Sequence, residues 1–339
     1  MPEADRYSTR FGGSSPVIDF HCHCADPLVY DWGRPHSVSS GFGSRSLPPD
    51  DTTKHSYRAM RDAATQIDDM DARGVDVNML SASIIAQNTD WAPPHEAAAM
   101  DRHANEYIAD WVRDRPSRFI GSFTLPLQDT DLALRELAHA VDDLGMRVAT
   151  VSSNAAGGVY LGDRRFWPVW EELELRRVTV FMHPHGGRDE RLQAFWLWNS
   201  VGQSIEETMF MTSMIYEGTL DRFPRLKIVL AHGGGFLPHY PGRVDRNATA
   251  HPESVVNIAG RPSDYFRRFH YDSCTYSTAV LSALVTVVGA DRVVLGGDYP
   301  IGEADPVGAV RSAAGLSPDD VNMILSGNAA RLLEIEAGG

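Results

Sequence analysis

The fold of this chain is decided by the stretch Val17-Ile18-Asp19-Phe20-His21-Cys22-His23, a short apolar run that ends in two histidines. Residues two apart in a strand share a face, so His21 and His23 would point the same way at its carboxyl end. Cys22 lies between them and would face the opposite side, where a small apolar side chain packs against helices. Two convergent imidazoles are half of a metal site.

Three later apolar runs also end in polar residues. Residues 178–182 lead to His183, residues 227–231 lead to His232, and residues 292–295 lead through two glycines to Asp298. Strand ends meet round one mouth if parallel strands close into a barrel, and catalytic groups of that fold gather there. We therefore expect these four polar segments to lie close together.

Short β-branched runs alternate with helical segments along the whole chain. The expected strands are 17–20, 75–81, 119–124, 148–152, 178–183, 227–232, 269–273 and 292–295, and the expected helices are 57–73, 95–113, 132–144, 165–176, 204–220, 236–246, 278–288, 318–326 and 329–335. This alternation is typical of parallel βαβ construction. It predicts a (β/α)8 TIM barrel, and the alternative is a doubly wound open sheet, which would spread the strand ends along a line.

Length and composition predict one domain over residues 1–339, with 43% apolar and 22% charged residues. Residues 1–16 predict a flexible N-terminal segment without the apolar core of a signal peptide. Residues 26–51 are rich in Gly, Pro and Ser and predict a loop insertion after the first strand, near the barrel mouth.

The net charge and the cysteine content limit which binding partners and which cellular compartment we expect. A formal charge of −14 repels phosphate backbones and anionic membranes, so nucleic acid is excluded as a partner. No stretch approaches 18 apolar residues, so no membrane span is expected. Three cysteines are too few and odd in number for a disulfide framework, which predicts a cytoplasmic protein.

The strand-end residues predict a metal site. His21, His23, His183 and Asp298 offer three nitrogens and one carboxylate oxygen, a set that suits Zn²⁺ and accommodates Mn²⁺. The fourth strand contains no lysine that could bridge two ions, so the predicted site holds one divalent ion.

His232 stands apart because three glycines follow it, Gly233-Gly234-Gly235. We interpret the glycines as room for a substrate to approach the imidazole, and His232 as a general acid/base beside the metal. A ligand role for His232 is the alternative. His185 follows Pro184 at the expected mouth and is a candidate substrate contact.

Six motifs together resemble the aminocarboxymuconate-semialdehyde decarboxylase-like (amidohydrolase 2) branch of the amidohydrolase superfamily. The motifs are Asp19-Phe20-His21-Cys22-His23, Met70-Asp71-Ala72-Arg73-Gly74-Val75-Asp76-Val77, Pro126-Leu127-Gln128-Asp129, Ala231-His232-Gly233-Gly234-Gly235, Gly242-Arg243-Val244-Asp245 and Gly297-Asp298-Tyr299-Pro300. The resemblance implies a (β/α)8 barrel with one divalent metal on His21, His23, His183 and Asp298, and with His232 as catalytic acid or base. It also implies that Arg243 reaches the substrate carboxylate of a neighbouring subunit, hence a homodimer.

The substrate is less defined. Where the family decarboxylase has an arginine that clamps a carboxylate, this chain has Lys54, with Arg58 and Arg61 nearby, and lysine offers a point charge and not a bidentate fork. The candidate substrate contacts are Arg243, Lys54, Arg58, Asn154, His185 and Trp196. The aromatic residues expected near the mouth favour a flat conjugated substrate, namely Trp32, Phe42, Trp91, Phe195, Trp196 and Trp198.

Three functions compete for this site. The first is metal-dependent, non-oxidative decarboxylation of an aromatic or muconate-type acid, in which His232 and Asp298 move the proton that replaces carbon dioxide. The second is hydrolysis or hydration of a ring-cleavage product, a lactone or an oxo-acid by the same site. The third is a binding or scaffolding barrel without chemistry. Four strand-end ligands, and a histidine, His232, that is followed by glycines, argue against it.

Overall fold

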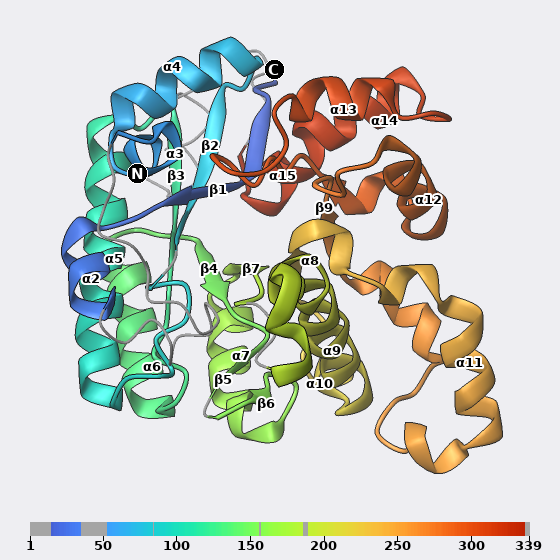
Figure 1. Ribbon diagram of the computed structural model, residues 1–339. Helices are drawn as coiled ribbons and strands as arrows, with labels where there is room; N and C mark the ends of the chain where they lie inside the picture. Colours follow the sequence, from blue (N-terminus) through green and yellow to red (C-terminus); the bar gives the residue numbers. More distant parts are fainter. Residues whose placement is uncertain (1–14, 35–52, 84, 156, 186–188, 336–339) are drawn as a thin grey trace.

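The computed structural model describes residues 15–34, 53–83, 85–155, 157–185 and 189–335. Eight parallel strands follow one another round a barrel in chain order (Figure 1), namely β1 (Ile18–Cys24), β2 (Val77–Ala82), β3 (Phe119–Phe123), β4 (Val148–Val151), β7 (Thr179–Met182), β8 (Lys227–Leu230), β9 (His270–Asp272) and β10 (Val293–Val294). The expected (β/α)8 barrel is confirmed.

Backbone hydrogen bonds close the barrel between its first and last strands. The N–H of Phe20 donates to the carbonyl of Leu295 at 2.8 Å. Beyond β10, the N–H of His23 donates to the carbonyl of Tyr299 at 2.9 Å, and the N–H of Tyr299 donates to the carbonyl of His21 at 3.1 Å. The open-sheet alternative is therefore wrong, because these bonds leave neither strand as a free edge.

β1 contains an irregularity that the sequence did not predict. Asp19 lies opposite Asn78 of β2, whereas Cys22 lies opposite Leu80, so β1 carries one extra residue over this interval. An extra residue reverses the alternation of side chains beyond it. Phe20 packs inside the barrel, and the bulge turns His21 to the inside as well, where its ring lies 5.1 Å from that of Phe181.

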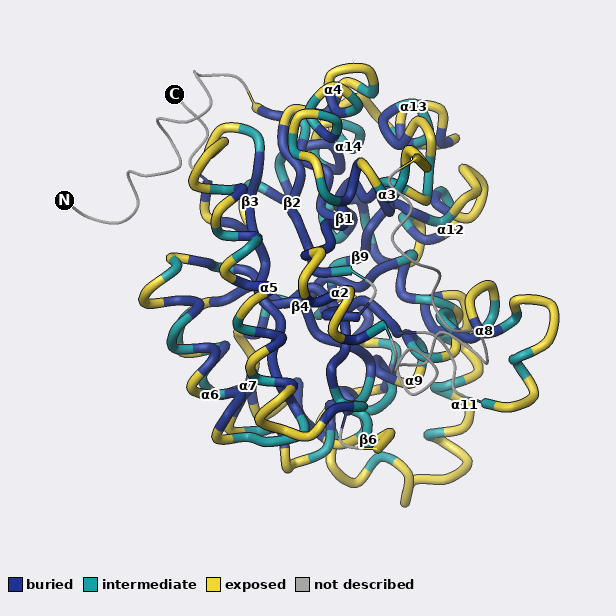
Figure 2. The backbone as a smooth tube through the Cα atoms, turned by 60° about the vertical axis from the view of Figure 1, so that its left-hand side comes forward, coloured by how far each residue is buried: buried dark blue, intermediate teal, exposed yellow. Residues whose placement is uncertain are grey.

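The core has two layers, and the strands between them are buried, dark blue in Figure 2. The layer inside the barrel is apolar and consists of Ile18, Phe20, Val77, Met79, Ile120, Val148, Phe181, Val229, Ala231, Val294, Ala329, Leu332, Leu333 and Ile335. The larger layer lies between the strands and the surrounding helices and contains Cys22 and Cys24. Cys22 thus faces away from the barrel interior, as its position between two histidines predicted.

Helices surround the barrel in the order α2 (Pro27–Gly33), α3 (His55–Ala59), α4 (Ala63–Arg73), α5 (Pro94–Asp114), α6 (Thr130–Ala138), α7 (Trp167–Leu175), α8 (Leu197–Ser200), α9 (Gly202–Tyr216), α10 (Thr219–Arg222), α11 (Pro241–Ala250), α12 (Thr278–Val288), α13 (Pro306–Ser312), α14 (Pro318–Asn322) and α15 (Asn328–Leu332). A small antiparallel hairpin, β5 (Asn154–Ala155) with β6 (Val159–Tyr160), follows β4. No helix among the described residues combines the length and apolar character needed to cross a bilayer.

Several expected helices differ in their bounds. The expected helix 204–220 is α9 and α10, separated at Gly218. The expected helix 57–73 is two helices, because Asp62 caps α4 by accepting hydrogen bonds from the N–H groups of Ala64 and Thr65. The expected helix 236–246 is a short 3₁₀ turn followed by α11, which begins at Pro241, a residue suited to the first helical turn.

The expected closing helices and the loop insertion also differ from the structure. Helices α14 and α15 form one helical run through a π-helical turn, Met323–Gly327, and α13 was not predicted. Part of the expected loop 26–51 is helical, since α2 begins after Asp26, whose carboxylate accepts from the N–H of Leu28 at 2.8 Å. Residues 35–51 of this insertion, and 1–14 of the expected N-terminal segment, lie outside the described residues.

Candidate metal centre and active site

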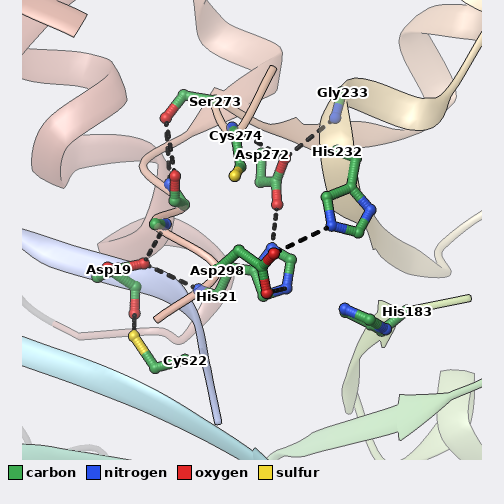
Figure 3. Close-up of polar contacts among 12 residues, drawn as sticks. Asp19, His21, Cys22, His183, His232, Gly233, Asp272, Ser273, Cys274 and Asp298 are labelled. Carbon is green, nitrogen blue, oxygen red and sulfur yellow. Dashed lines mark hydrogen bonds and ion pairs between the residues drawn. The ribbon is translucent and has the colours of Figure 1, made fainter. Parts of the chain in front are cut away.

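Four histidines and one aspartate converge where the strands end inside the barrel mouth. Figure 3 shows His21, His183 and His232 of this group together with Asp298. One ligand atom each from His21, His183, His232 and Asp298 lie within 4.8 Å of one another. His23 is not a member of this tightest group, but its Nε2 lies 3.1 Å from Oδ1 of Asp298. The structure thus brings together all five residues that the sequence analysis assigned to the centre.

His21 is oriented by a carboxylate behind it. Its Nδ1 lies 2.6 Å from Oδ2 of the fully buried Asp272, so Nδ1 carries a proton and donates it. Oδ1 of Asp272 accepts from the backbone N–H groups of Gly233 and Cys274 at 3.0 and 3.1 Å. His21 therefore presents Nε2 to the mouth in the way that metal-bound histidines are commonly held.

His23 provides a test of whether a cation fits. Its Nδ1 lies 3.0 Å from the hydroxyl oxygen of Ser81, which uses its single hydrogen on the carbonyl of Cys22 at 3.0 Å. With that hydrogen on the carbonyl, Ser81 accepts the Nδ1 proton of His23, and the Nε2 lone pair faces Asp298. Burial lowers the pKa of His23, and the 3.1 Å between Nε2 and Oδ1 of Asp298 is a separation that two ligands of one cation can have. The residues fit a metal ion.

His183 supplies a third neutral imidazole. Its Nδ1 lies 2.9 Å from the carbonyl oxygen of Pro184 and also contacts the side chain of Gln87. Its Nε2 is buried without a hydrogen-bond partner among the described residues. Burial, reinforced by the neighbouring His21 and His23, holds the pKa of His183 well below its usual range. An unprotonated, buried lone pair is what a metal ligand requires.

Asp298 is the only carboxylate in the converging group. Its Oδ1 lies 3.3 Å from Nε2 of His21, and its Oδ2 lies 3.6 Å from Nε2 of His232. Burial opposes ionisation, but the neighbouring His21 outweighs it and holds the pKa of Asp298 well below its usual range. The centre therefore has one fixed negative charge.

His232, like His21, is held through Nδ1 by a buried carboxylate, but its partner comes from a helix. Its Nδ1 lies 2.5 Å from Oε1 of Glu207, a fully buried residue of α9. Burial alone would lower the pKa of His232, but Glu207 and Asp298 outweigh it and raise the pKa well above the usual value. Burial raises the pKa of Glu207 to about 7. His232 thus retains a proton that a neutral free imidazole would have lost, and it can supply that proton at Nε2.

The glycines after His232 have a different role from the one that the sequence suggested. They were interpreted as room for a substrate. A Cβ on Gly234 would lie 2.7 Å from the ring of Tyr271, and a Cβ on Gly235 would lie 2.3 Å from the carbonyl of Ser204 and 2.9 Å from Oε2 of Glu207. Both have a positive φ, which glycine adopts without strain. Gly234 thus lets the turn pack against Tyr271 of β9, and Gly235 lets it pack against α9, from which Glu207 reaches His232.

Sequence reasoning missed the residues that orient the ligands. Asp272 ends β9, so the strand-end rule that selected His183 and Asp298 would have found it. Asp19 accepts from the backbone N–H groups of His21 and Gly297, at 3.1 and 2.8 Å, and so joins β1 to the segment that carries Asp298. Glu207 had no comparable signal, because it lies in the middle of a helix.

The predicted substrate contacts are dispersed. Lys54 precedes α3 and Arg58 lies within it, both exposed, and Nη2 of Arg58 lies 3.3 Å from Nδ1 of His55. Asn154 donates from Nδ2 to Glu206 at 2.7 Å. None of these contacts reaches the converging histidines.

The other predicted contacts differ in exposure. His185 is buried two residues beyond His183. Trp196 is 60% exposed, and its ring lies 5.5 Å from that of the buried Trp198. Arg243 is exposed on α11, which projects away from the barrel (Figure 1). Phe195, another aromatic residue expected near the mouth, is 90% exposed. Phe42 lies outside the described residues.

The chain belongs to the amidohydrolase family, because the model of that family matches residues 18–335, nearly the whole sequence. It is 34% identical to the 2-amino-3-carboxymuconate-6-semialdehyde decarboxylase of Dictyostelium discoideum over 325 residues, which cover 94% of this chain and 84% of the relative. The resemblance to the decarboxylase-like branch is thereby confirmed.

Two solved structures of decarboxylases share this fold. The 5-carboxyvanillate decarboxylase of Sphingomonas paucimobilis superposes with a TM-score of 0.84 and 28% identity, covering 95% of this chain and all of the other. The dihydroxybenzoic acid decarboxylase of Polaromonas sp. JS666 superposes with a TM-score of 0.80 and 26% identity, covering 95% of this chain and 97% of the other. The latter was solved with bound manganese and an inhibitor, 2-nitroresorcinol.

Glu207→Gln is expected to lower kcat by about 10- to 100-fold with little change in KM, the usual cost of altering a group that orients a catalytic partner. The amide oxygen can still accept from Nδ1 of His232, but it lacks the charge that stabilises the imidazolium. Steady-state kinetics with an acid that the unaltered protein converts would measure the effect.

The matched control is Glu136→Gln, another buried glutamate, which accepts from Asn105 at 2.8 Å and from Arg102 at 2.7 Å outside the site. It should lower the thermal midpoint and leave kcat unchanged. Equal kcat values for Glu207→Gln and the unaltered protein would assign Glu207 to packing alone.

Proposed function

We propose that this chain is a metal-dependent, non-oxidative decarboxylase of an aromatic or muconate-type carboxylic acid. The observation that carries the proposal is the placement of His232, with Nδ1 fixed by the buried Glu207 and Nε2 directed at Asp298 beside the other imidazoles. Such a histidine can deliver a proton to a carbon atom held at the mouth. The activities named for the relatives support the same reaction class.

We assign the metal ligands as His21, His23, His183 and Asp298, and propose one ion per chain. Three nitrogens and one oxygen favour Zn²⁺, and the manganese bound in the Polaromonas structure supports Mn²⁺ as the alternative. A bound divalent ion would act as a Lewis acid that draws the substrate carboxylate or its neighbouring oxygen into place. Metal analysis of the purified protein would identify the ion.

The residues of the chain account for the proton that decarboxylation requires. The bond between the substrate carbon and its carboxylate breaks, carbon dioxide leaves, and the electron pair stays on the carbon. His232 transfers a proton from Nε2 to that carbon, so that one C–H bond replaces one C–C bond. Glu207 holds the ring by Nδ1 throughout and favours the charged form of the imidazole before transfer.

By this proposal a proton from solvent returns to His232 through a water that donates a hydrogen bond to the Asp298 carboxylate. Oδ2 of Asp298 is 3.6 Å from Nε2 of His232, too long for a direct hydrogen bond, and the ionised carboxylate orients the water without carrying the proton itself. Asp298 thus has a second role, in orienting this water, beside its role as a ligand.

A product assay would test the reaction. The purified chain, loaded with Zn²⁺ or Mn²⁺, would be incubated with 2,6-dihydroxybenzoate, 5-carboxyvanillate and 2-amino-3-carboxymuconate-6-semialdehyde, the acids named for its relatives. We expect loss of carbon dioxide from at least one acid, detected by mass spectrometry, and no product from metal-free protein. Addition of water to an ester, lactone or oxo-acid, with no loss of carbon dioxide from any acid, would replace the proposal by the hydrolase or hydratase alternative.

We further propose a homodimer in which Arg243 reaches the substrate carboxylate of the neighbouring subunit. The support is that α11 has no buried residue and that Arg243 is exposed on it, away from the barrel of its own chain (Figures 1 and 2). We also retain the cytoplasm as the proposed location, supported by three buried cysteines that are free thiols.

Arg243→Lys is expected to lower kcat/KM by about tenfold, because lysine cannot make the bidentate contact that a guanidinium makes with a carboxylate. Metal content and thermal midpoint should not change, since Arg243 is exposed. The matched control is Arg246→Lys, three residues further along α11 and also exposed, which should have no effect.

Mixing two inactive variants would test whether sites are shared. A dimer of one Arg243→Ala chain and one His232→Asn chain would contain one intact site if Arg243 serves the neighbouring subunit. Activity should therefore reappear on subunit exchange. Mixed dimers that form and stay inactive would place the function of Arg243 within its own chain.

A further inference from the structure

We propose that Tyr276 is a positioning residue that holds the Asp298 carboxylate in one orientation and keeps it apart from His232. Its catalytic consequence rests on the proposed decarboxylase function, whereas its effect on the carboxylate does not. The hydroxyl of Tyr276 donates to Oδ2 of Asp298 at 2.7 Å.

The two oxygens of Asp298 have different neighbours. Oδ1 lies 3.1 Å from Nε2 of His23 and 3.3 Å from Nε2 of His21. Oδ2 faces the hydroxyl of Tyr276 at 2.7 Å and Nε2 of His232 at 3.6 Å. The Tyr276 hydrogen bond therefore fixes which oxygen is turned toward the proposed ligands and which toward the proposed acid/base.

The same hydrogen bond leaves His232 available. The Asp298 carboxylate and a protonated His232 this close would ordinarily form a direct ion pair. That pairing would occupy the Nε2 proton that the proposed proton transfer needs. At 3.6 Å the two groups are beyond hydrogen-bond distance, while the shorter contact of Oδ2 goes to Tyr276. The phenol has a single hydrogen, and the short contact directs it to Oδ2 of Asp298.

The backbone at Tyr276 is held in an unfavourable conformation. Its φ is +53°, a region that bulky residues rarely adopt. It lies in the turn between β9 and α12, where Thr275 donates from its hydroxyl to the carbonyl of Ser277 at 2.9 Å and Ser277 caps α12. Such strain persists where the surroundings fix it and is concentrated at functional sites.

The strained turn aims the tyrosine at the centre. Its ring lies nearly parallel to that of His232, with an interplanar angle of 21° and centroids 6.5 Å apart. Tyr276 thus contacts both members of the proposed proton-transfer pair, through its ring on one and its hydroxyl on the other. A phenylalanine would keep the ring and remove only the hydrogen bond.

The test compares Tyr276→Phe with Tyr265→Phe. Tyr265 is a matched control, because its hydroxyl also donates to an aspartate, Asp221, at 2.6 Å, in a segment that contributes nothing to the converging group. The first readout is the Kd of Mn²⁺ for each metal-free protein, measured by electron paramagnetic resonance. We expect Tyr276→Phe to raise this Kd by about tenfold, the low end for removing a partner of a metal ligand, and Tyr265→Phe to leave it unchanged.

The second readout is kinetic and separates positioning from packing. Tyr276→Phe should lower kcat by about tenfold while KM stays within about twofold, because the lost hydrogen bond affects the orientation of Asp298 and not substrate contact. Tyr265→Phe should lower only the thermal midpoint. The proposal is overturned if Tyr276→Phe leaves both the Mn²⁺ Kd and kcat unchanged, or if it changes only the thermal midpoint.

The two readouts distinguish a failure of the proposed decarboxylase function from a failure of the role proposed for Tyr276. If the unaltered protein decarboxylates none of the acids tested, the proposed function fails, but the Mn²⁺ titration still decides whether Tyr276 orients Asp298. If decarboxylation is found and Tyr276→Phe matches the unaltered protein in both readouts, only the role of Tyr276 fails.

Discussion

Asp298→Asn is expected to weaken metal binding by at least about 10²-fold and to remove turnover with the metal, because Asp298 is the only anionic donor in the converging group. Asparagine has nearly the same shape and tolerates the positive φ of 51° at this position, so the fold should persist. Metal content after dialysis, measured by plasma emission spectroscopy, and the thermal midpoint would be recorded together.

The unaltered protein provides the comparison for this variant. Removal of its metal by a chelator should abolish activity, and added Zn²⁺ or Mn²⁺ should restore it, whereas neither ion should restore Asp298→Asn. Two findings would contradict the assignment. A variant that keeps one tightly bound ion would remove Asp298 from the ligand set, and two ions per chain in the unaltered protein would refute a mononuclear site.

The barrel and the members of its centre could be predicted because both depend on local signals. Each of the residues His21, His183, His232 and Asp298 ends or follows a short apolar run, and parallel closure sends all such ends to one mouth. The same logic explains why helix bounds were less accurate. A cap such as Asp62, or a proline at the start of α11, changes a boundary without changing the apolar pattern.

The orientation of the centre could not be predicted, because it depends on contacts distant in sequence. Asp272 lies 251 residues from His21, and Glu207 lies 25 residues from His232. Glu207 follows a second glutamate, Glu206, on the same helix, and only the tertiary structure buries one of them against a histidine. No spacing rule distinguishes the two.

The bulge in β1 is a similar case. The alternation rule correctly placed His21 and His23 on one face, but it also placed Phe20 on the other. One extra residue between Asp19 and Cys22 lets the apolar Phe20 fill the barrel and the next residue, His21, enter the centre. The change from core to site within a single strand therefore depends on register, which an isolated sequence does not specify.

His232→Asn is expected to lower kcat by roughly 10²- to 10⁴-fold, the usual range for removing a positioned acid or base. Asparagine preserves part of the volume and can still hydrogen-bond to Glu207, but it cannot carry a proton to the substrate. If His21, His23, His183 and Asp298 are the ligands, the variant should keep its metal, with a Kd for Mn²⁺ within about tenfold of the unaltered value. Kinetics and metal analysis on the same preparation would measure both effects.

The metal content of this variant decides between the two arrangements that the distances allow. His232 belongs to the group of atoms within 4.8 Å, and His23 does not, so distance alone would favour His232 as the third imidazole ligand. Two contacts favour the opposite assignment. Nε2 of His23 lies 3.1 Å from Oδ1 of Asp298, whereas Nε2 of His232 lies 3.6 Å from Oδ2, beyond hydrogen-bond distance. A variant that loses metal and activity together would make His232 a ligand, and the proton would then have to come from another group at the mouth.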